Sequence, residues 1–555
     1  MASITPFSGT LGDRLAKHLL RRTSYNITKT RIEEFKNYTV DQAIASLLVT
    51  PEKRLEQPIH FVNDTVLSPS PWINNDPVYG DVISKSDAGG EFRLQSYLSS
   101  WWLDEARRDT SIRSKMSYFL FTNFTASAGT TSANYYDYLK LLETFCLGNW
   151  KEFTYQVSIN NRMLDFLNND QNTNTNPNEN FAREILELFT IGKGEQAGIG
   201  DYTNYTEKDV EEAAKVLSGW RSTKNNRGLY TTGPENGNLP RGYAVPNKHY
   251  FGRKEFSHRF SNYVIEEWDT TNKTEEEKVA RIESELREFI TLVLDQSETA
   301  KYVCRKLYRF FVSRKITLEI ENDIISPLAT IFRVNYNLEE TITTLLKSKH
   351  FYDSDDNDSS NEIIGGLIKP PIELLLHTLT MIDYPVPDPI DNGKEFYLDF
   401  FHASIKRHFL EKAAQAPFTP NSVAGFPANY EAPDYDKLWF NSATIIPRFN
   451  LMDLLIKNSI ANFSITTFVE SNISVPSDST ILVREMTDLI FPETIDTNRL
   501  NYFVNDILLD NGNLTPLMWE DEWNTYKNSN DSSVVEDALK PLLRAVAWSQ
   551  EYQTY

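Results

Sequence analysis

The chain has 555 residues, of which 40% are hydrophobic and 12% aromatic, enough for several average domains or one large helical body. Its formal net charge of −21 excludes a general nucleic-acid-binding role, because binding to phosphates needs a basic face. Two cysteines, Cys146 and Cys304, are too few for a disulfide framework. Both lie in apolar helical patterns, which predicts buried thiols.

Residues 1–6 lack the charged and apolar regions of a secretory signal, and no apolar run reaches the ~18 residues of a membrane span. The sequence therefore predicts no membrane span. A cytoplasmic location is the default expectation, and export together with a partner stays open.

Apolar residues at three- and four-residue steps predict a mainly α fold. We expect a large multi-helix, bundle-like body with long polar loops and at most a few short strands. Thr10 is the expected N-cap of the first helix. The best strand candidates are Val264–Glu266 and Ser464–Val469. The predicted helices span residues 10–24, 92–108, 110–124, 134–149, 151–168, 179–190, 206–219, 274–294, 297–313, 321–332, 337–347, 370–382, 396–413, 449–458 and 534–550.

Long polar stretches separate these helices, at residues 56–90, 168–178 and 221–260. The asparagine-rich stretch 168–178 is expected to stay out of the core. Residues 353–364 alternate oxygen-bearing side chains as a calcium loop does, but they lack its central glycine and final glutamate. They therefore predict an acidic surface loop.

The Pro- and Asp-rich stretch 383–393 is the best candidate for a domain boundary. It would separate an N-terminal helical body, residues 1–382, from a C-terminal helical part, residues 383–555, packed on the first.

The segment Asn176–Trp220 is the most informative part of the chain, because polar residues crowd one end of a strongly apolar helix. Asn178 is a suitable N-cap, and Glu179 suits the positive end of the helix dipole. One interpretation is a capped amphipathic helix with surface ion pairs. The other is that Asn180, Arg183 and Glu184 form a buried polar network or bind a ligand. Phe181, Ile185, Leu188 and Phe189 would face the core.

The next helix begins at Thr206, which with Asp209 resembles a capping box. Among the eight histidines no pair has zinc-ligand spacing. His249 and His258 share one polar loop, where each is either solvated or, for His249 above all, a ligand or proton-transfer group. Nucleophile-elbow, phosphate-loop and dinucleotide motifs do not occur.

Taken together, several blocks of the sequence resemble a large bacterial family, domain of unknown function 1800. The blocks that carry the resemblance are Lys17–Thr23, Lys115–Met116, Asn178–Thr190 with Gly192 and Gly194, Thr206–Trp220, Ile368–Glu373, Pro420–Pro427, Asn441–Thr444 with Arg448, and Ser549–Gln553. They span nearly the whole chain. The resemblance implies a mainly helical fold and no established activity. It also implies a protein partner, a sulfatase-like protein of the domain of unknown function 1501 type.

The chain departs from the family pattern at two histidines. Family members often carry Trp-His-x-His-Phe, where this chain has Leu120–Phe124, so Phe121 and Asn123 stand at the histidine positions. The family's later His-Asp appears as His249 followed by Tyr250. If the imidazoles hold a metal in relatives, this chain keeps one of three. We therefore predict no cofactor and no metal ligands, and a divalent metal is disfavoured.

Three functions follow as hypotheses. The first is a non-catalytic binding or assembly protein. Whether its partner is exported or lies at the cell surface stays open. The second is a hydrolase in which Glu184 is the general acid or base, Arg183 and Asn180 position the substrate, and His249 assists. The third is carbohydrate or polymer binding through Trp101, Trp102, Trp220 and tyrosines of the loops. The candidate ligand-binding residues are Asn178, Glu179, Asn180, Trp220, Asn123 and Arg448.

Overall fold

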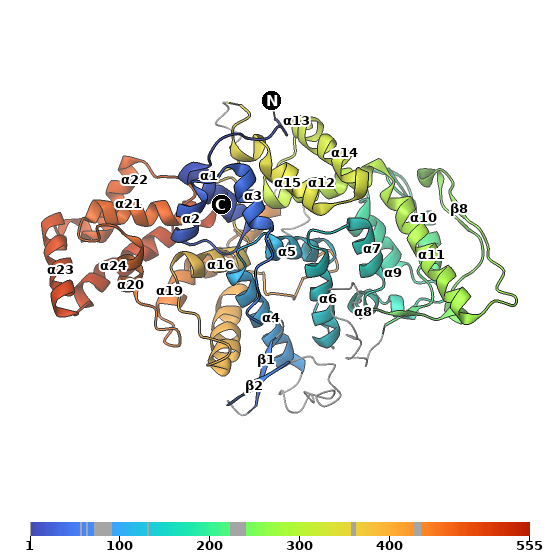
Figure 1. The fold of residues 1–555 in the computed structure, drawn as a ribbon, viewed down its shortest axis with the longest axis horizontal. Coiled ribbons are helices and arrows are strands. Elements are labelled where there is room, and N and C mark those ends of the chain that lie inside the picture. Colours follow the sequence, from blue (N-terminus) through green and yellow to red (C-terminus); the bar gives the residue numbers. More distant parts are fainter. Residues whose placement is uncertain are drawn as a thin grey trace.

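The computed structural model describes residues 2–55, 58–62, 65–71, 91–129, 132–222, 240–356, 362–426 and 435–555. These residues are mainly helical, with four two-stranded antiparallel sheets, which confirms the predicted fold class. The body is elongated (Figure 1). Most of the predicted loop 56–90, residues 223–239 of the loop 221–260, and residues 357–361 of the calcium-like loop lie outside the described residues.

The middle of the body combines helices from the first third of the chain with two that come much later (Figure 1). These elements are α1 (Gly12–Thr23), α2 (Lys29–Phe35), α3 (Val40–Leu48), α4 (Glu91–Arg108), α5 (Arg113–Asn123), α6 (Ser132–Phe145), α16 (Pro371–Met381) and the π-helical η8 (Glu395–Leu410). Helix α4 packs against α16, η8 and α6 and is therefore central to this region.

The helices that follow in the chain lead to one side of the body, where Figure 1 shows α10 and α11. They are α7 (Trp150–Ser158), α8 (Asn161–Phe166), α9 (Glu179–Glu184), the π-helical η2 (Ile185–Thr190), α10 (Glu207–Val216), α11 (Glu275–Leu294), α12 (Ser297–Phe311), α13 (Leu318–Ile320), the π-helical η6 (Glu321–Ile325), α14 (Ser326–Asn335) and α15 (Leu338–Lys347). No helix among the described residues combines the length and apolarity that crossing a bilayer requires.

Helices from residue 445 onward form the opposite end of the body, and the chain then returns to the middle near α1, where Figure 1 marks its C-terminus. They are α18 (Ile445–Phe449), α19 (Leu451–Ile456), α20 (Ile465–Asn472), α21 (Ser479–Ile490), α22 (Thr497–Asn501), the π-helical η10 (Tyr502–Leu508), α23 (Pro516–Ser529), α24 (Ser533–Ala547) and α25 (Gln550–Gln553).

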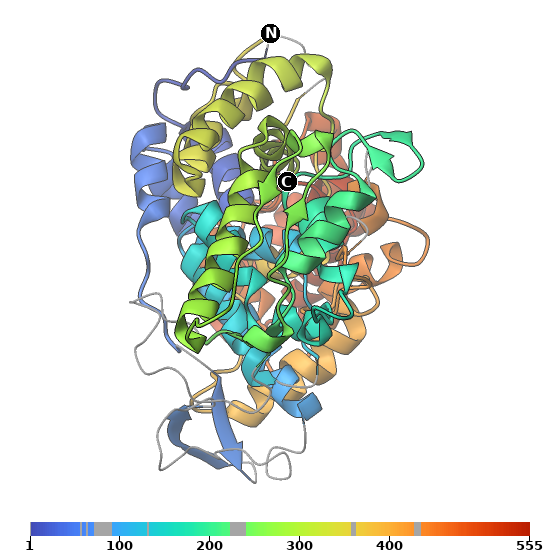
Figure 2. The same cartoon turned by 90° about the vertical axis from the view of Figure 1, so that its right-hand side faces the viewer.

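The strands and 3₁₀ turns are short and lie between helices. The strands are β1 (Ile59–Val62), β2 (Thr65–Pro71), β3 (Gln196–Gly198), β4 (Asp201–Tyr202), β5 (Trp220–Arg221), β6 (Tyr243–Ala244), β7 (Lys254–Glu255) and β8 (Val264–Ile265). The 3₁₀ turns are η1 (Asn169–Gln171), η4 (Pro246–Lys248), η5 (His258–Phe260), η7 (His350–Tyr352), η9 (Tyr435–Trp439) and η11 (Asp510–Gly512). Figure 2 shows β1 and β2 as a hairpin that projects from the body.

Two local predictions are wrong. Residues 464–469 form the start of helix α20 instead of a strand, because Ser464 caps the helix through the Thr467 amide and the apolar residues are buried at helical spacing. Thr10 does not cap α1. It pairs with Thr39 in an isolated bridge, and the residue before α1 is Leu11, which offers no side-chain cap. The predicted strand at Val264 is present as β8, and the capping box of Thr206 is confirmed.

A buried ion pair lies where distant parts of the chain meet in the middle of the body. The Lys115 Nζ atom is 2.5 Å from the Glu373 Oε2 atom, and both side chains are 1% exposed. The Tyr555 hydroxyl donates to the same carboxylate, and the Lys115 ammonium lies over the rings of Tyr25 and Tyr555. Burial raises the pKa of Glu373 and lowers the pKa of Lys115, so removal from water outweighs the attraction between the two charges.

Other buried cations tie the C-terminal residues to the same region. The Arg448 guanidinium donates to the Lys369 carbonyl at 2.8 Å and to the Gln553 side chain at 2.9 Å. The Lys369 ammonium donates to the Tyr552 carbonyl at 2.8 Å. Residues on both sides of the stretch 383–393 therefore share one buried centre, and the proposed division there stays a prediction.

Both cysteines are fully buried, as predicted. Burial raises the pKa of the Cys146 thiol to about 12 and also raises that of Cys304. Neither thiol is therefore poised to act as a thiolate near neutral pH.

Candidate functional site

The segment that the sequence singles out forms helix α9 and then continues as the π-helical η2. The Asn178 side chain accepts a hydrogen bond from the Asn180 amide at 3.0 Å, which confirms the predicted N-cap. Of the residues predicted to face the core, three are buried and the last is half-buried: Phe181, Ile185, Phe189 and Leu188.

The loop before α9 is mostly exposed or half-buried, as predicted, but two of its asparagines are part of the buried structure. Asn169 and Asn172 are fully buried, and their side-chain amides donate to the carbonyls of Leu217 at 3.1 Å and Ala214 at 2.8 Å. These carbonyls lie at the end of α10, where a helix has no partners of its own for them. The Asn172 side chain also accepts from the Asn178 amide, so buried asparagines join the end of α10 to the start of α9.

Arg183 forms the surface ion pairs of the simpler interpretation. Both of its terminal nitrogens lie 2.7 Å from the two oxygens of Glu207 at the start of α10, and Glu179 is 3.3 Å away. The Arg183 side chain is 32% exposed. The Asn180 side chain donates to the Leu167 carbonyl at 3.1 Å. Arg183 and Asn180 therefore hold α9 to its neighbours.

Glu184 fits the alternative interpretation, because the residue is only 9% exposed and no described residue hydrogen-bonds to its carboxyl group. Burial, followed by the nearby Glu187 carboxylate, raises the pKa of Glu184 to about 7, although Arg183 and Lys193 oppose the shift. The Glu187 carboxylate itself accepts from the Tyr205 hydroxyl at 2.9 Å. Glu184 can thus give up or take a proton near neutral pH.

The π-helical turn η2 follows Glu184 directly, and side chains of α12 bond its carbonyls. The Tyr302 hydroxyl donates to the carbonyls of Glu187 and Leu188 at 3.2 and 3.3 Å, and the Lys306 ammonium donates to Leu188 at 2.5 Å. Burial lowers the pKa of Lys306 to about 7. Such π-helical turns often occur at functional sites.

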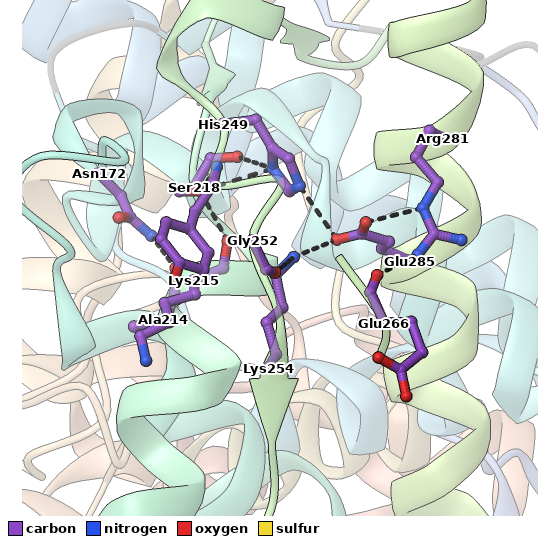
Figure 3. A network of polar contacts seen from close by, with 11 residues as sticks. Asn172, Ala214, Lys215, Ser218, His249, Gly252, Lys254, Glu266, Arg281 and Glu285 are labelled. Atoms are coloured by element: carbon purple, nitrogen blue, oxygen red, sulfur yellow. Dashed lines mark hydrogen bonds and ion pairs between the residues drawn. The ribbon is translucent and has the colours of Figure 1, made fainter. Parts of the chain in front are cut away.

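His249 lies at the centre of a different network, which Figure 3 shows in detail. Its Nδ1 atom is 2.8 Å from the Ser218 carbonyl oxygen, and its Nε2 atom is 3.1 Å from Glu285 Oε2. Both ring nitrogens of His249 thus have oxygen partners, and the side chains of His249 and Glu285 are 0% exposed.

Glu285 also has two cationic partners, Lys254 and Arg281, in the same network (Figure 3). The Lys254 ammonium lies 2.6 Å from Oε2, and the Arg281 Nε atom lies 2.8 Å from Oε1. Burial raises the pKa of Glu285, but the hydrogen bond from His249 and the charge of Lys254 outweigh it, and the net pKa is lowered. The network fixes the loop of β6–β8 against α11.

The structure does not join the predicted catalytic residues into one group. Among the described residues, no hydrogen bond or ion pair connects Arg183 or Glu184 with His249. Both ring nitrogens of His249 are already engaged, whereas His258 of the same loop is exposed. Glu184 alone keeps an environment suited to acid–base chemistry.

Gly219 explains why the segment Thr206–Trp220 ends in Gly-Trp, and it leads to a test. Its φ is +85°, and an added Cβ would lie 2.9 Å from the His249 backbone nitrogen. We expect Gly219→Ala to lower the free energy of unfolding by about 2–3 kcal/mol, from backbone strain plus the close contact. Urea denaturation gives the value.

Gly512 is a matched control for this substitution. Its φ is +87°, and no atom lies within 4 Å of an added Cβ. Gly512→Ala should therefore cost only about 1 kcal/mol, the strain component alone. Equal losses in both variants would show that the approach to His249 is unimportant.

The other predicted ligand-binding residues are built into the core. Trp220 is 1% exposed and lies in β5, which pairs with β6. Arg448 is fully buried and donates hydrogen bonds to the Lys369 carbonyl and the Gln553 side chain. Burial lowers the pKa of Arg448 to about 9. The Asn123 amide donates to the Phe119 carbonyl at 2.6 Å.

The positions of the missing family histidines do not form a metal-binding set. Phe121 has no ligand atom and packs on Tyr118 and Phe418, and the Asn123 nitrogen is engaged as stated. Among the described residues, no group of three histidine, cysteine, aspartate or glutamate side chains is placed to hold an ion. The residues present at these three positions therefore do not fit a metal ion.

A cavity of about 530 Å³ lies elsewhere, between segments that were not predicted to form a site together. It is enclosed by residues 50–54, helices α4, α5 and α6, and the end of α16. Apolar groups form one part of its wall and charged groups the other. The apolar residues are Pro51, Trp101, Trp102, Ala106, Leu139 and Leu379, and the charged residues are Glu52, Lys53, Arg54, Glu105, Arg107, Arg108, Asp109, Arg113, Glu143 and Asp383.

Glu105 is the most perturbed acid of this cavity. Burial and the nearby Asp104 raise its pKa to about 7, although the charges of Lys53 and Arg108 and the Leu55 amide oppose the shift. Glu143, which pairs with Lys53 at 2.5 Å, has a lowered pKa because its lysine partners outweigh burial. One acid of the cavity is therefore half-protonated near neutral pH.

Glu105→Gln should change how stability depends on pH. In wild type the folded protein keeps the Glu105 proton to about pH 7, whereas the unfolded chain loses it near 4.5. Ionisation therefore weakens the folded state, and stability falls as pH rises between these values. Between pH 5 and 8 the variant should gain about 1–3 kcal/mol relative to wild type. Urea unfolding midpoints at pH 5 and pH 8 test this, and Glu52→Gln, at an exposed residue, is the control. Parallel plots of stability against pH for wild type and Glu105→Gln would contradict the prediction.

Sequence reasoning missed the cavity because its walls come from distant segments. The adjacent Trp101 and Trp102 were the available signal, and the sequence analysis assigned them to carbohydrate binding. Both indoles are largely buried and line the cavity with only part of their surface.

Comparison with known proteins gives one result. A family described as a protein of unknown function, DUF1800, matches residues 18–553, which is nearly the whole chain. No curated protein and no solved structure is similar enough to count as a match. The chain therefore belongs to the DUF1800 family.

Proposed function

We propose that this protein binds a small molecule in the cavity between residues 50–54, α4, α5, α6 and α16. The observation that carries the proposal is the cavity itself, because its volume of about 530 Å³ lies in the range of ligand sites and its wall combines apolar and ionisable groups. Glu105, with its pKa of about 7, adds the perturbed acid that is typical of functional sites.

Binding is favoured over catalysis by the state of the predicted catalytic residues. His249 is enclosed and paired, and Arg183 is held by Glu207, so neither is available to a substrate. This agrees with the first hypothesis from the sequence, a non-catalytic binding protein.

Filling the cavity tests the proposal. Ser117 lines it from α5, and no described residue hydrogen-bonds to its hydroxyl, so Ser117→Phe adds volume without breaking a bond. Thermal shifts would be measured with three probes: 2-naphthoate, 2-naphthamide and 2-naphthylmethylamine. We expect at least one to raise the Tm of wild type and of Ser117→Ala, but not of Ser117→Phe. No shift with any probe, or equal shifts in Ser117→Phe, would overturn the proposal.

An assembly role with a protein partner extends the same hypothesis. Support comes from exposed apolar side chains near the chain's C-terminal helices: Ile446 in α18 is 62% exposed, and Trp548, which bonds the Phe449 carbonyl, is 53% exposed. The partner expected from the family resemblance is the sulfatase-like protein of the 1501 type. A native mass spectrum of the co-expressed pair tests this, and two strictly monomeric species would contradict it.

The second candidate function is acid–base hydrolysis at Glu184. The observation that favours it is the pKa of about 7 of a nearly buried carboxyl group beside a π-helical turn. Hydrolysis of p-nitrophenyl acetate, phosphate and glucoside would be measured for wild type, Glu184→Gln and the exposed control Glu179→Gln. Activity that only Glu184→Gln removes would support this function, whereas equal activity in all three would reject it.

A further inference from the structure

The cations that line the cavity differ in whether they have partners. The Lys53 ammonium is 2.5 Å from Glu143, Arg54 pairs with Asp388, and Arg108 is 2.9 Å from Asp104. Arg113, the first residue of α5, is half-buried, and no described residue accepts a hydrogen bond from its guanidinium group. Among the described residues it is the cavity cation without an ion-pair partner.

Arg107 adds a second incompletely bonded guanidinium group. Arg107 and Arg108 both pair with Asp104, and the distance from the Arg107 guanidinium to the Asp104 carboxylate is 2.5 Å. The buried Nε atom of Arg107 has no hydrogen-bond partner among the described residues. Burial and the neighbouring Arg108 lower the pKa of Arg107, although Asp104 opposes the shift. A buried donor without an acceptor is costly, and an anion in the cavity would supply the acceptor.

Three of the five acids that line the cavity, Asp109, Glu143 and Glu105, form no ion pair with Arg113 or Arg107 among the described residues. Asp109 accepts four hydrogen bonds, from the amides and hydroxyls of Ser111 and Ser114, at 2.6–2.9 Å. Glu143 is held between Lys53 and Lys140. Glu105 accepts only the Leu55 amide and is half-protonated near neutral pH. The N-terminal end of the α5 dipole adds positive potential at Arg113.

From this imbalance we infer that the ligand is a small organic carboxylate, held by Arg113 and Arg107 with its apolar part against Leu139, Leu379 and the two indoles. This inference rests on the proposed binding function. Arginine suits a carboxylate because its planar group offers two parallel donors. The apolar wall and the volume favour an organic body over an inorganic anion, which would leave most of the cavity unfilled.

The three naphthyl probes named above separate this inference from the binding proposal, because they share a ring and differ in charge. By titration calorimetry, wild type should bind 2-naphthoate at least about tenfold more tightly than the amide or the amine, the value of one charge-assisted hydrogen bond. If the amide or amine binds equally well, the carboxylate class is wrong and the cavity remains a binding site. If no probe binds, both proposals fail.

Arginine substitutions then test the assigned residues. Arg113→Gln should weaken 2-naphthoate about tenfold or more and leave the amide unchanged, so that the preference disappears. Arg54→Gln is the matched control, because Arg54 lines the same cavity but already pairs with Asp388. A preference that survives in Arg113→Gln, or that both substitutions remove equally, would overturn the role of Arg113. Unchanged melting curves without ligand would show that the variants are folded.

Discussion

Replacing Glu373 with glutamine is expected to lower the free energy of unfolding by about 3–5 kcal/mol, the cost of leaving a buried charge without its partner. The substitution keeps the shape of the side chain but removes the negative charge beside Lys115, 2.5 Å away and 1% exposed. Lys115 must then stay charged in an apolar setting or give up its proton. Urea unfolding at pH 7.5 gives the loss.

Replacing both partners should cost less. Burial already outweighs the attraction within this pair, so Lys115→Met with Glu373→Gln, which keeps an acceptor for the Tyr555 hydroxyl, is expected to lose less than Glu373→Gln alone. Glu152→Gln breaks the exposed pair with Arg287 and should cost less than about 1 kcal/mol. A Glu373→Gln loss as small as that of Glu152→Gln would contradict the role of the buried pair.

Glu285→Gln should be destabilising to a similar degree, about 3–5 kcal/mol at pH 7, because it leaves buried cations without their common carboxylate. Glu285 is 0% exposed and accepts from His249, Lys254 and Arg281. Its pKa is lower in the folded protein than in the unfolded chain. The stabilisation is therefore present above the unfolded pKa and is lost as pH falls through the folded one.

Unfolding at pH 7 and at acidic pH measures both effects, and the difference between wild type and Glu285→Gln should shrink as pH falls. Glu283→Gln is the control on the same helix, because Glu283 pairs with Arg241 at 3.1 Å near the surface. It should change stability by less than about 1 kcal/mol. A constant difference across pH would mean that the Glu285 charge is not the cause.

Most helices could be predicted from the sequence, because long segments repeat apolar residues at helical spacing. The failure at residues 464–469 has a physical reason: Ile, Thr and Val favour strands as single residues, but the Ser464 cap and burial at helical spacing decide the outcome. The π-helical turn η2 could not be predicted, because side chains that bond its carbonyls, such as Tyr302, come from another helix.

The site was predicted only in part. The polar end of an apolar helix correctly drew attention to Glu184, which is nearly buried. Composition could not single out Asn169 and Asn172 within the polar loop 168–178, because buried asparagines look like solvated ones until their partners on α10 are known. The cavity around Arg113 needs five separated segments, and nothing local in the sequence connects them.

The contacts of residues 549–555 have a consequence for how the protein opens. Such segments commonly fray, but here the Tyr555 and Gly365 backbones are hydrogen bonded, and the Lys369 amide donates to Gln553. Detachment of residues 549–555 would expose the Glu373 carboxylate and the cations around it to water. The amide hydrogens of Gly365, Lys369 and Tyr555 should therefore exchange with solvent only when the whole centre unfolds cooperatively.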